Sequence, residues 1–250
     1  MSNEISATTT TSPTPRAVPR PGAIYDPVAR SLDAIGDRWS LVLVRQLLLG
    51  PKGFQELRMR TGIAPRVLSG RLKHLIEQGF VDSLEGARGG YQISERGRSL
   101  EPIVASIARW FTMHGIDALG IDPGRFTETS PQSIIESLPF LLREDAARGA
   151  DVTFEIRLTG HGGGVFSIQI ANGQCVVKPE FAERADVRYT ADARVWCALA
   201  LGLADARELI RSGQMTKEGA DVAMDHYFHQ IHRSGSADTG TMTCDEEAKG

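Results

Sequence analysis

Hydrophobic positions recur with helical spacing at the start of the chain. Along residues 26–39 they lie four and three residues apart, on one face of an α-helix. These positions are Val28, Leu32 and Ile35. Residues 39–50 are apolar nearly all round apart from Arg45 and Gln46, which predicts a helix buried in the middle of its domain. A third, shorter helix is predicted over residues 54–62.

The fourth helical segment, residues 64–79, has one apolar and one polar side. Its inward stripe consists of Leu68, Leu72 and Leu75. Proline is tolerated in the first turn of a helix, where backbone N–H groups stay free for a phosphate. The sequence begins this helix with Ala64-Pro65, so we expect it to present a polar face and a free N-terminus to solvent.

The pattern then alternates as half-buried strands do, in residues 80–85 and 91–95. A tight turn with Arg88 at its tip joins them, and residues 99–120 return to an amphipathic helix. Three helices, a two-stranded wing and a trailing helix form a winged helix-turn-helix, whose outward helix enters the major groove of DNA. We predict DNA contacts from Pro65, Arg66, Ser69, Gly70, Lys73 and Arg88. Such arrangements also serve in protein interactions, and that alternative stays open.

The second half of the chain mixes both patterns. A linker rich in turn residues is followed by a helix interrupted near Pro139. Strand-like runs follow at residues 152–160, 164–173, 174–180 and 185–192. Asn172-Gly173 predicts a hairpin, and helices are predicted over residues 193–213 and 217–232. Together these elements indicate helices layered against a sheet.

The fold class is therefore mainly α with α+β, an N-terminal winged helix-turn-helix followed by a C-terminal α+β domain. The predicted divisions are residues 1–22 (disordered tail), 23–120 (first domain), 121–130 (linker), 131–233 (second domain) and 234–250 (disordered tail).

The composition and the N-terminal segment together predict where in the cell the protein works. No apolar stretch approaches the roughly 18 to 20 residues of a membrane span, and the N-terminus lacks the apolar core of a secretory signal. Cys175, Cys197 and Cys244 have no CxxC spacing and are interpreted as reduced thiols. We expect a cytoplasmic protein with no membrane contact. Residues 1–122 carry 15 Lys and Arg against 12 Asp and Glu, and the remainder 13 against 19, which agrees with a first half that meets a polyanion.

No catalytic, metal or cofactor site is predicted. His226, His229 and His232 are three residues apart, which spreads them around a helix, and no ligand set completes them. The HGGG run at residues 161–164 is similar to an esterase oxyanion loop, but no GxSxG supplies a nucleophile, so a hairpin loop is favoured. No phosphate loop or dinucleotide motif is present. An enzymatic function therefore has no catalytic residues to support it.

Residues 25–115 resemble the HxlR-type winged-helix regulators of bacteria. The matching motifs are GDRW, RQLLLGPKGFQEL and LSGRLKHLIEQG, with YQISERGRSLEPIVASIARW beyond them. The resemblance implies a homodimer whose first and trailing helices pair across a two-fold axis, reading a palindromic operator in double-stranded DNA. Many members carry a sensing cysteine in the first helix. Here Asp26 takes that place, so thiol sensing through this domain is not expected.

The segment ADVRYTADARVWCALALGLADARELIRSGQMTKEGADVAMDHYFHQI resembles the end of a sterol-carrier-protein-type lipid-binding domain. Its features are a strand leading into a helix, the pair Gly202 and Gly213, and KEGADVAMDHYF. The resemblance implies an apolar tunnel, although most of the candidate residues must also serve as ordinary core. The candidate lining residues are Phe154, Ile156, Phe166, Ile168, Val195, Trp196, Leu199, Leu203, Ile210, Met215, Met224 and Phe228.

Two functional hypotheses follow. In the first, an apolar ligand in the second domain changes the geometry of the recognition helices and so gates DNA binding. In the second, the second domain only dimerises or supports the DNA-binding domain and binds no ligand.

Overall fold

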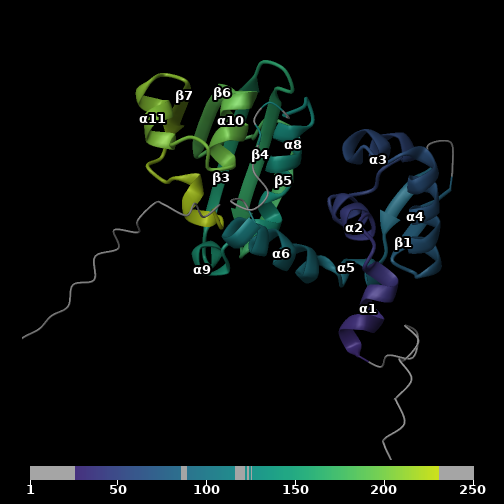
Figure 1. The fold of residues 1–250 in the computed structure, drawn as a ribbon. Helices are drawn as coiled ribbons and strands as arrows, with labels where there is room; N and C mark the ends of the chain where they lie inside the picture. Colours follow the sequence, from purple (N-terminus) through teal and green to yellow (C-terminus); the bar gives the residue numbers. More distant parts are fainter. Residues whose placement is uncertain (1–25, 86–88, 116–121, 123, 125, 231–250) are drawn as a thin grey trace, which may run out of the picture.

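Two domains lie side by side in the computed structural model, which describes residues 26–85, 89–115, 122, 124 and 126–230 (Figure 1). We call residues 27–115 the first domain and residues 130–230 the second domain. The two predicted tails and the wing tip at Arg88 lie outside the described residues. None of the described helices is both long enough and apolar enough to cross a membrane.

The first domain contains the predicted helices and wing in the predicted order. Its elements are α1 (Pro27–Ile35), α2 (Ser40–Leu48), α3 (Phe54–Thr61), α4 (Pro65–Glu77), β1 (Val81–Leu84), β2 (Gly90–Ile93), α5 (Glu95–Arg98), α6 (Glu101–Trp110) and η2 (Phe111–Gly115). Strands β1 and β2 pair antiparallel, and Lys52 forms an isolated bridge to Tyr91 beside them. This is a winged helix-turn-helix.

Leucines at helical spacing close the core of the first domain. Those without solvent exposure are Leu43, Leu47, Leu57, Leu68 and Leu75. They come from α2, α3 and α4, so burial of these side chains fixes the three helices against one another. Each buried leucine contributes on the order of 2 kcal/mol.

The second domain is a five-stranded sheet with helices packed on it. Its elements are α8 (Ser130–Ile135), η4 (Leu138–Leu141), α9 (Glu144–Ala147), β3 (Asp151–Thr159), β4 (Gly164–Ala171), β5 (Gln174–Lys178), β6 (Val187–Asp192), α10 (Ala193–Ala200), α11 (Ala206–Arg211), β7 (Met215–Gly219) and η5 (Met224–Tyr227). The strand order is β5-β4-β3-β6-β7. Strands β3 and β6 run parallel, and the other neighbours run antiparallel.

Alternation along the strands gives the sheet one apolar face. Phe154, Ile156, Ile168 and Ile170 are fully buried on that face, toward the helices. The predicted hairpin at Asn172-Gly173 is present, with φ of 52° and 74°, the left-handed conformations that a tight two-residue turn requires. The α+β class is confirmed.

Two predicted helices are corrected by the structure. The helix expected over residues 193–213 divides into α10 and α11 at a turn where Gly202 has a φ of 68°. The helix expected over residues 217–232 is absent, because residues 215–219 pair with β6 as the edge strand β7. Within the described residues after β7, the one further element is a short 3₁₀ turn, η5. Pairing with β6 outweighs the helical preference of Lys217 and Glu218.

Candidate nucleic-acid interface and interdomain site

The polar side of α4 faces solvent. Arg66, Ser69, Gly70 and Lys73 are all exposed, and Pro65 occupies the first turn as expected. The residue before the helix, Ala64, makes no side-chain cap hydrogen bond, so the N-cap residue does not satisfy the first backbone N–H groups of α4. This face combines two cations, a hydroxyl and an open position at Gly70, where an added Cβ would meet no atom within 4 Å.

Three contacts hold the other sides of α4. Leu68, Leu72 and Leu75 are buried in the domain core. His74 Nε2 lies 3.0 Å from the carbonyl oxygen of Ala34, at the end of α1. Arg71 pairs with Asp37 across 3.4 Å. The exposed face is therefore presented on a fixed base, which is what insertion into a groove requires.

Asp37, in the GDRW motif, caps α2. Its carboxylate accepts hydrogen bonds from the backbone N–H groups of Trp39 and Ser40 and from the Ser40 hydroxyl. Burial favours a higher pKa for Asp37, but these hydrogen bonds and the charge of Arg71 hold it below its usual value. The motif therefore joins the start of α2 to α4.

Two helix faces in the first domain expose apolar side chains. In α1 the residues Val28 and Leu32 are 66% and 54% exposed. In α6 and η2 the exposed side chains are Ile103, Ile107, Trp110 and Met113. In both cases the spacing places them on one side of their helix, and nothing among the described residues covers them.

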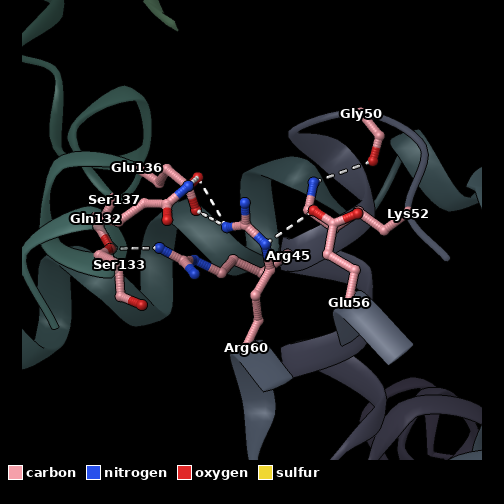
Figure 2. A network of polar contacts seen from close by, with 9 residues as sticks. All are labelled: Arg45, Gly50, Lys52, Glu56, Arg60, Gln132, Ser133, Glu136 and Ser137. Carbon is pink, nitrogen blue, oxygen red and sulfur yellow. Dashed lines mark hydrogen bonds and ion pairs between the residues drawn. The ribbon is translucent and has the colours of Figure 1, made fainter. Parts of the chain in front are cut away.

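A cluster of charged side chains joins the two domains (Figure 2). Arg60, at the end of α3, places Nη1 2.8 Å from both carboxylate oxygens of Glu136, which follows α8. The side chains of Arg60 and Glu136 are only 20% and 13% exposed. Glu136 also accepts a hydrogen bond from Gln132, while Arg60 Nε donates to Glu56 at 3.0 Å.

Arg45 makes a second set of contacts across the same junction. Its Nη2 donates to the carbonyl oxygen of Ser133 and to the hydroxyl of Ser137, both at 2.7 Å. We call Arg45, Arg60, Ser133, Glu136 and Ser137 the interdomain clamp. Burial lowers the pKa of Arg45, and the charge of Glu136 opposes that shift. The same two influences act on Lys52, which is nearly buried beside the clamp.

The apolar packing also crosses the junction. Phe140, from η4 of the second domain, is 4% exposed and belongs to the core of the first domain. Its neighbours Leu138, Leu141 and Leu142 pack into the core of the second domain instead. Sequence reasoning missed this junction. The local signal was Arg45 in a mainly apolar helix, because a guanidinium that is largely removed from water needs a partner.

Most of the predicted lining residues of the second domain lie in or against its core. Those that are buried are Phe154, Ile156, Phe166, Ile168, Trp196, Met215 and Phe228. Val195, Leu199 and Met224 are partly buried against that core, Leu203 is also partly buried, and Ile210 is 41% exposed. The structure presents a different hollow between α6 and α9, of about 490 Å³, lined by Arg109, Glu144, Asp145, Arg148 and His229.

One polar atom stands out inside this apolar core. The indole Nε1 of Trp196 is buried and has no hydrogen-bond partner among the described residues. The ring centroid of Trp196 lies 6.4 Å from that of Tyr189. The hydroxyl of Tyr189 accepts a hydrogen bond from the backbone N–H of Met224. A buried donor normally has an acceptor, so this N–H is available to one.

The HGGG run, the C-terminal histidines and the cysteines were also considered in the sequence, and those among the described residues lie in turns or in packed regions. Glycines 162 and 163 turn the β3–β4 hairpin, where a Cβ on Gly162 would come within 2.6 Å of the Glu128 carbonyl oxygen. His226 lies in η5 and His229 follows it, whereas His232 lies outside the described residues. Burial raises the pKa of Cys175 to about 12 and that of Cys197 to about 11, so both thiols stay protonated near neutral pH. Cys244 lies outside the described residues.

Fold and exposed helix together define a winged-helix protein joined to an α+β domain. Residues 34–117 match the HxlR-like helix-turn-helix family, and residues 135–231 match the SCP-2 sterol transfer family. The chain belongs to the HxlR-like helix-turn-helix family and carries an SCP-2 sterol transfer domain after its helix-turn-helix domain.

Known relatives match the first domain. YvaP of Bacillus subtilis, an HTH-type transcriptional regulator, is 34% identical over 88 residues, 33% of this chain and 82% of that protein. An HTH-type regulator of Mycobacterium tuberculosis is 33% identical over 87 residues, 33% of this chain. The match spans 55% of that mycobacterial protein. The reduced form of the redox regulator HypR shares 33% identity, with 34% of this chain and 90% of that chain covered at a TM-score of 0.32.

Proposed function

We propose that this protein is a sequence-specific, DNA-binding transcriptional regulator that works as a homodimer and is not an enzyme. The observation that carries the proposal is α4, which is anchored on three sides and exposes Arg66, Ser69, Gly70 and Lys73. A regulator works where the genome lies, so the proposal includes a cytoplasmic location.

In the proposed complex, α4 lies in the major groove. Arg66 and Lys73 contact phosphates or guanine edges, and Ser69 and Gly70 allow close approach of the helix. Pro65 starts the helix so that its first N–H groups meet a phosphate. Arg88, which the sequence places at the tip of the wing, is proposed to contact the adjacent DNA backbone or groove.

The dimer is proposed from the uncovered apolar faces of α1 and α6. Val28, Leu32, Ile103 and Ile107 would be removed from water by a second copy of the chain. A two-fold dimer would place its two α4 helices on half-sites about one DNA turn, roughly 34 Å, apart.

Selection of bound sequences from a random DNA library by the full-length chain tests the proposal. A palindromic consensus that survives excess competitor DNA is expected. Arg66→Ala and Lys73→Ala should weaken binding to it. A lost phosphate contact lowers the salt slope of binding by about 1, whereas a lost base contact relaxes specificity by about 1–3 kcal/mol.

Arg207→Ala and Lys178→Ala, exposed changes in the second domain, serve as charge-matched controls. Wild-type affinity of the Arg66/Lys73 double variant would exclude α4 as the recognition helix.

For the second domain we propose an apolar ligand that carries a hydrogen-bond acceptor. The supporting observation is the unpartnered indole N–H of Trp196 inside the core. A ligand that binds one conformation of the chain more tightly would shift operator affinity. Titration with a fluorescent long-chain fatty acid, in wild type and in Trp196→Phe, tests this idea. The substitution is expected to weaken binding severalfold, and equal binding would remove Trp196 from the ligand site.

A second candidate for this domain is a purely structural role. It is favoured by Phe140, which the second domain contributes to the core of the first. Operator affinity measured at saturating fatty acid separates the two. A shift in affinity supports gating. An unchanged affinity excludes gating by the fatty acid, and absence of fatty-acid binding in the same titration supports the purely structural role.

A further inference from the structure

The interdomain clamp lies at the helix-turn-helix turn itself. Arg60 is the penultimate residue of α3, and α4 begins five residues later at Pro65. Between them Gly62 has a φ of 66°, and the side chain of Ile63 is 2% exposed in the core. The turn is short and anchored, so the position of the end of α3 determines where α4 starts.

The partner of Arg60 belongs to the other domain. Glu136 follows the last residue of α8, and Ile135 before it is fully buried in the core of the second domain. Because these two residues are consecutive, a displacement of α8 moves the carboxylate that holds Arg60.

Removal of the negative charge of Glu136 leaves the positive charges around it largely uncompensated. Arg45, Lys52 and Arg60 lie around it, and within this cluster only Glu56 remains as a second carboxylate. Partly buried cations of like sign repel one another more strongly than exposed ones. The end of α3 would therefore move away from its present position when Glu136 is neutralised.

We infer that Glu136, a residue of the second domain, is a positioning residue for the recognition helix: by binding Arg60 it fixes the end of α3 and so the orientation of α4 toward DNA. The inference rests on the proposed function of α4. It also gives the second domain a route to the DNA-binding surface, since α8 packs on α10, the helix that carries Trp196.

The test uses full-length chains with Glu136→Gln, Arg60→Gln and both changes together. Glu180→Gln is the matched control, because it removes the same charge from the second domain at an exposed pair with Lys178. The measured quantity is the ratio of affinities for the selected consensus and for random DNA. Loss of one negative charge alone raises affinity for both DNAs, so the ratio isolates positioning from simple electrostatics.

We expect Glu136→Gln and Arg60→Gln each to lower this ratio about tenfold, with the double variant no worse than either single one. Glu180→Gln should leave the ratio unchanged. A wild-type ratio in Glu136→Gln, or additive effects in the double variant, would overturn the inference.

Amide hydrogen exchange of the free protein provides a readout without DNA. In Glu136→Gln, the amides of Gly62 and Leu68, which bond to Arg58 and Ala64, should exchange faster than in Glu180→Gln. Equal exchange in the two variants would overturn the positioning role. If the wild-type chain selected no DNA sequence, the proposed function would fail. The hydrogen-exchange comparison would still decide whether Glu136 stabilises the turn between α3 and α4.

Discussion

Ile135 and Glu136 are consecutive residues that belong to the packing of different domains. Ile135 is fully buried in the core of the second domain, whereas the carboxylate of Glu136 lies 2.8 Å from Nη1 of Arg60 in the first. Four residues further on, Phe140 enters the core of the first domain. Residues 135–140 are thus shared between two cores, and the second domain is part of the structural support of the winged helix.

This sharing leads to a prediction for Phe140→Ala. The substitution should destabilise the first domain by about 3–5 kcal/mol, because it leaves a cavity in a core that a neighbouring domain fills. Urea unfolding measures the loss, and exchange of the amides in α6, the helix on which η4 packs, localises it. Phe181→Ala is the control, since Phe181 lies in the second domain, is 65% exposed and has the guanidinium of Arg157 over its ring. Unfolding of Phe140→Ala at the wild-type midpoint would contradict the shared core.

Gly70→Ala separates stability from DNA binding. Gly70 lies within α4 with space around it, so alanine should stabilise the free protein by about 1 kcal/mol through its higher helix propensity. In the complex the added methyl group would meet the DNA, so operator affinity should fall. Thermal unfolding and a binding titration on the same sample give both numbers. A more stable protein with unchanged operator affinity would place Gly70 outside the interface.

Local patterns in the sequence are sufficient to predict the first domain. The inward leucines of α4 repeat at helical spacing, so the opposite, exposed face of the helix follows from the amino-acid sequence alone. The strands β3 to β6 and the Asn172-Gly173 turn are equally local. In contrast, the helix predicted at β7 is wrong, because Lys217 and Glu218 favour helices and only pairing with β6 makes them a strand.

The interdomain clamp could not be predicted for a related reason. Arg45 and Ser133 are 88 positions apart, and Arg60 and Glu136 are 76 positions apart. The partner of such an arginine depends on how two complete domains dock against each other. The spacing of hydrophobic residues along the chain does not specify this docking. A partly buried Arg45 in a mainly apolar helix signals that some partner exists, not where it lies.

Ile103→Lys tests the proposed dimer. Ile103 lies on the uncovered face of α6 and is 41% exposed in the single chain, so burial by a second copy would make a charge there costly. We expect a shift from dimer to monomer in sedimentation equilibrium, with weaker operator binding. Ile210→Lys is a close control, because Ile210 is also 41% exposed but lies in α11. If both variants kept the wild-type mass, the α6 face would not be the interface.

The last prediction concerns the stability of the second domain in acid, which depends on the charge of Glu155. This carboxylate is 1% exposed on β3 and accepts hydrogen bonds from Arg188 at 2.7 Å, Arg157 at 2.8 Å and the backbone N–H of Ala182 at 3.0 Å. Burial favours a higher pKa, but the hydrogen bonds and charges of these partners hold the pKa of Glu155 below its ordinary value of 4.5.

A folded-state pKa below the unfolded one means that Glu155 stabilises the domain fully above pH 4.5, and that this contribution is lost as the pH falls through the folded pKa. Glu155→Gln should cost about 1–3 kcal/mol at pH 7, since its arginine partners are themselves partly exposed. Measured by urea unfolding, the difference in stability between Glu155→Gln and wild type should shrink below pH 4.5. A difference that stayed constant into acid would mean that the charge of Glu155 is not what holds Arg157 and Arg188 on the sheet.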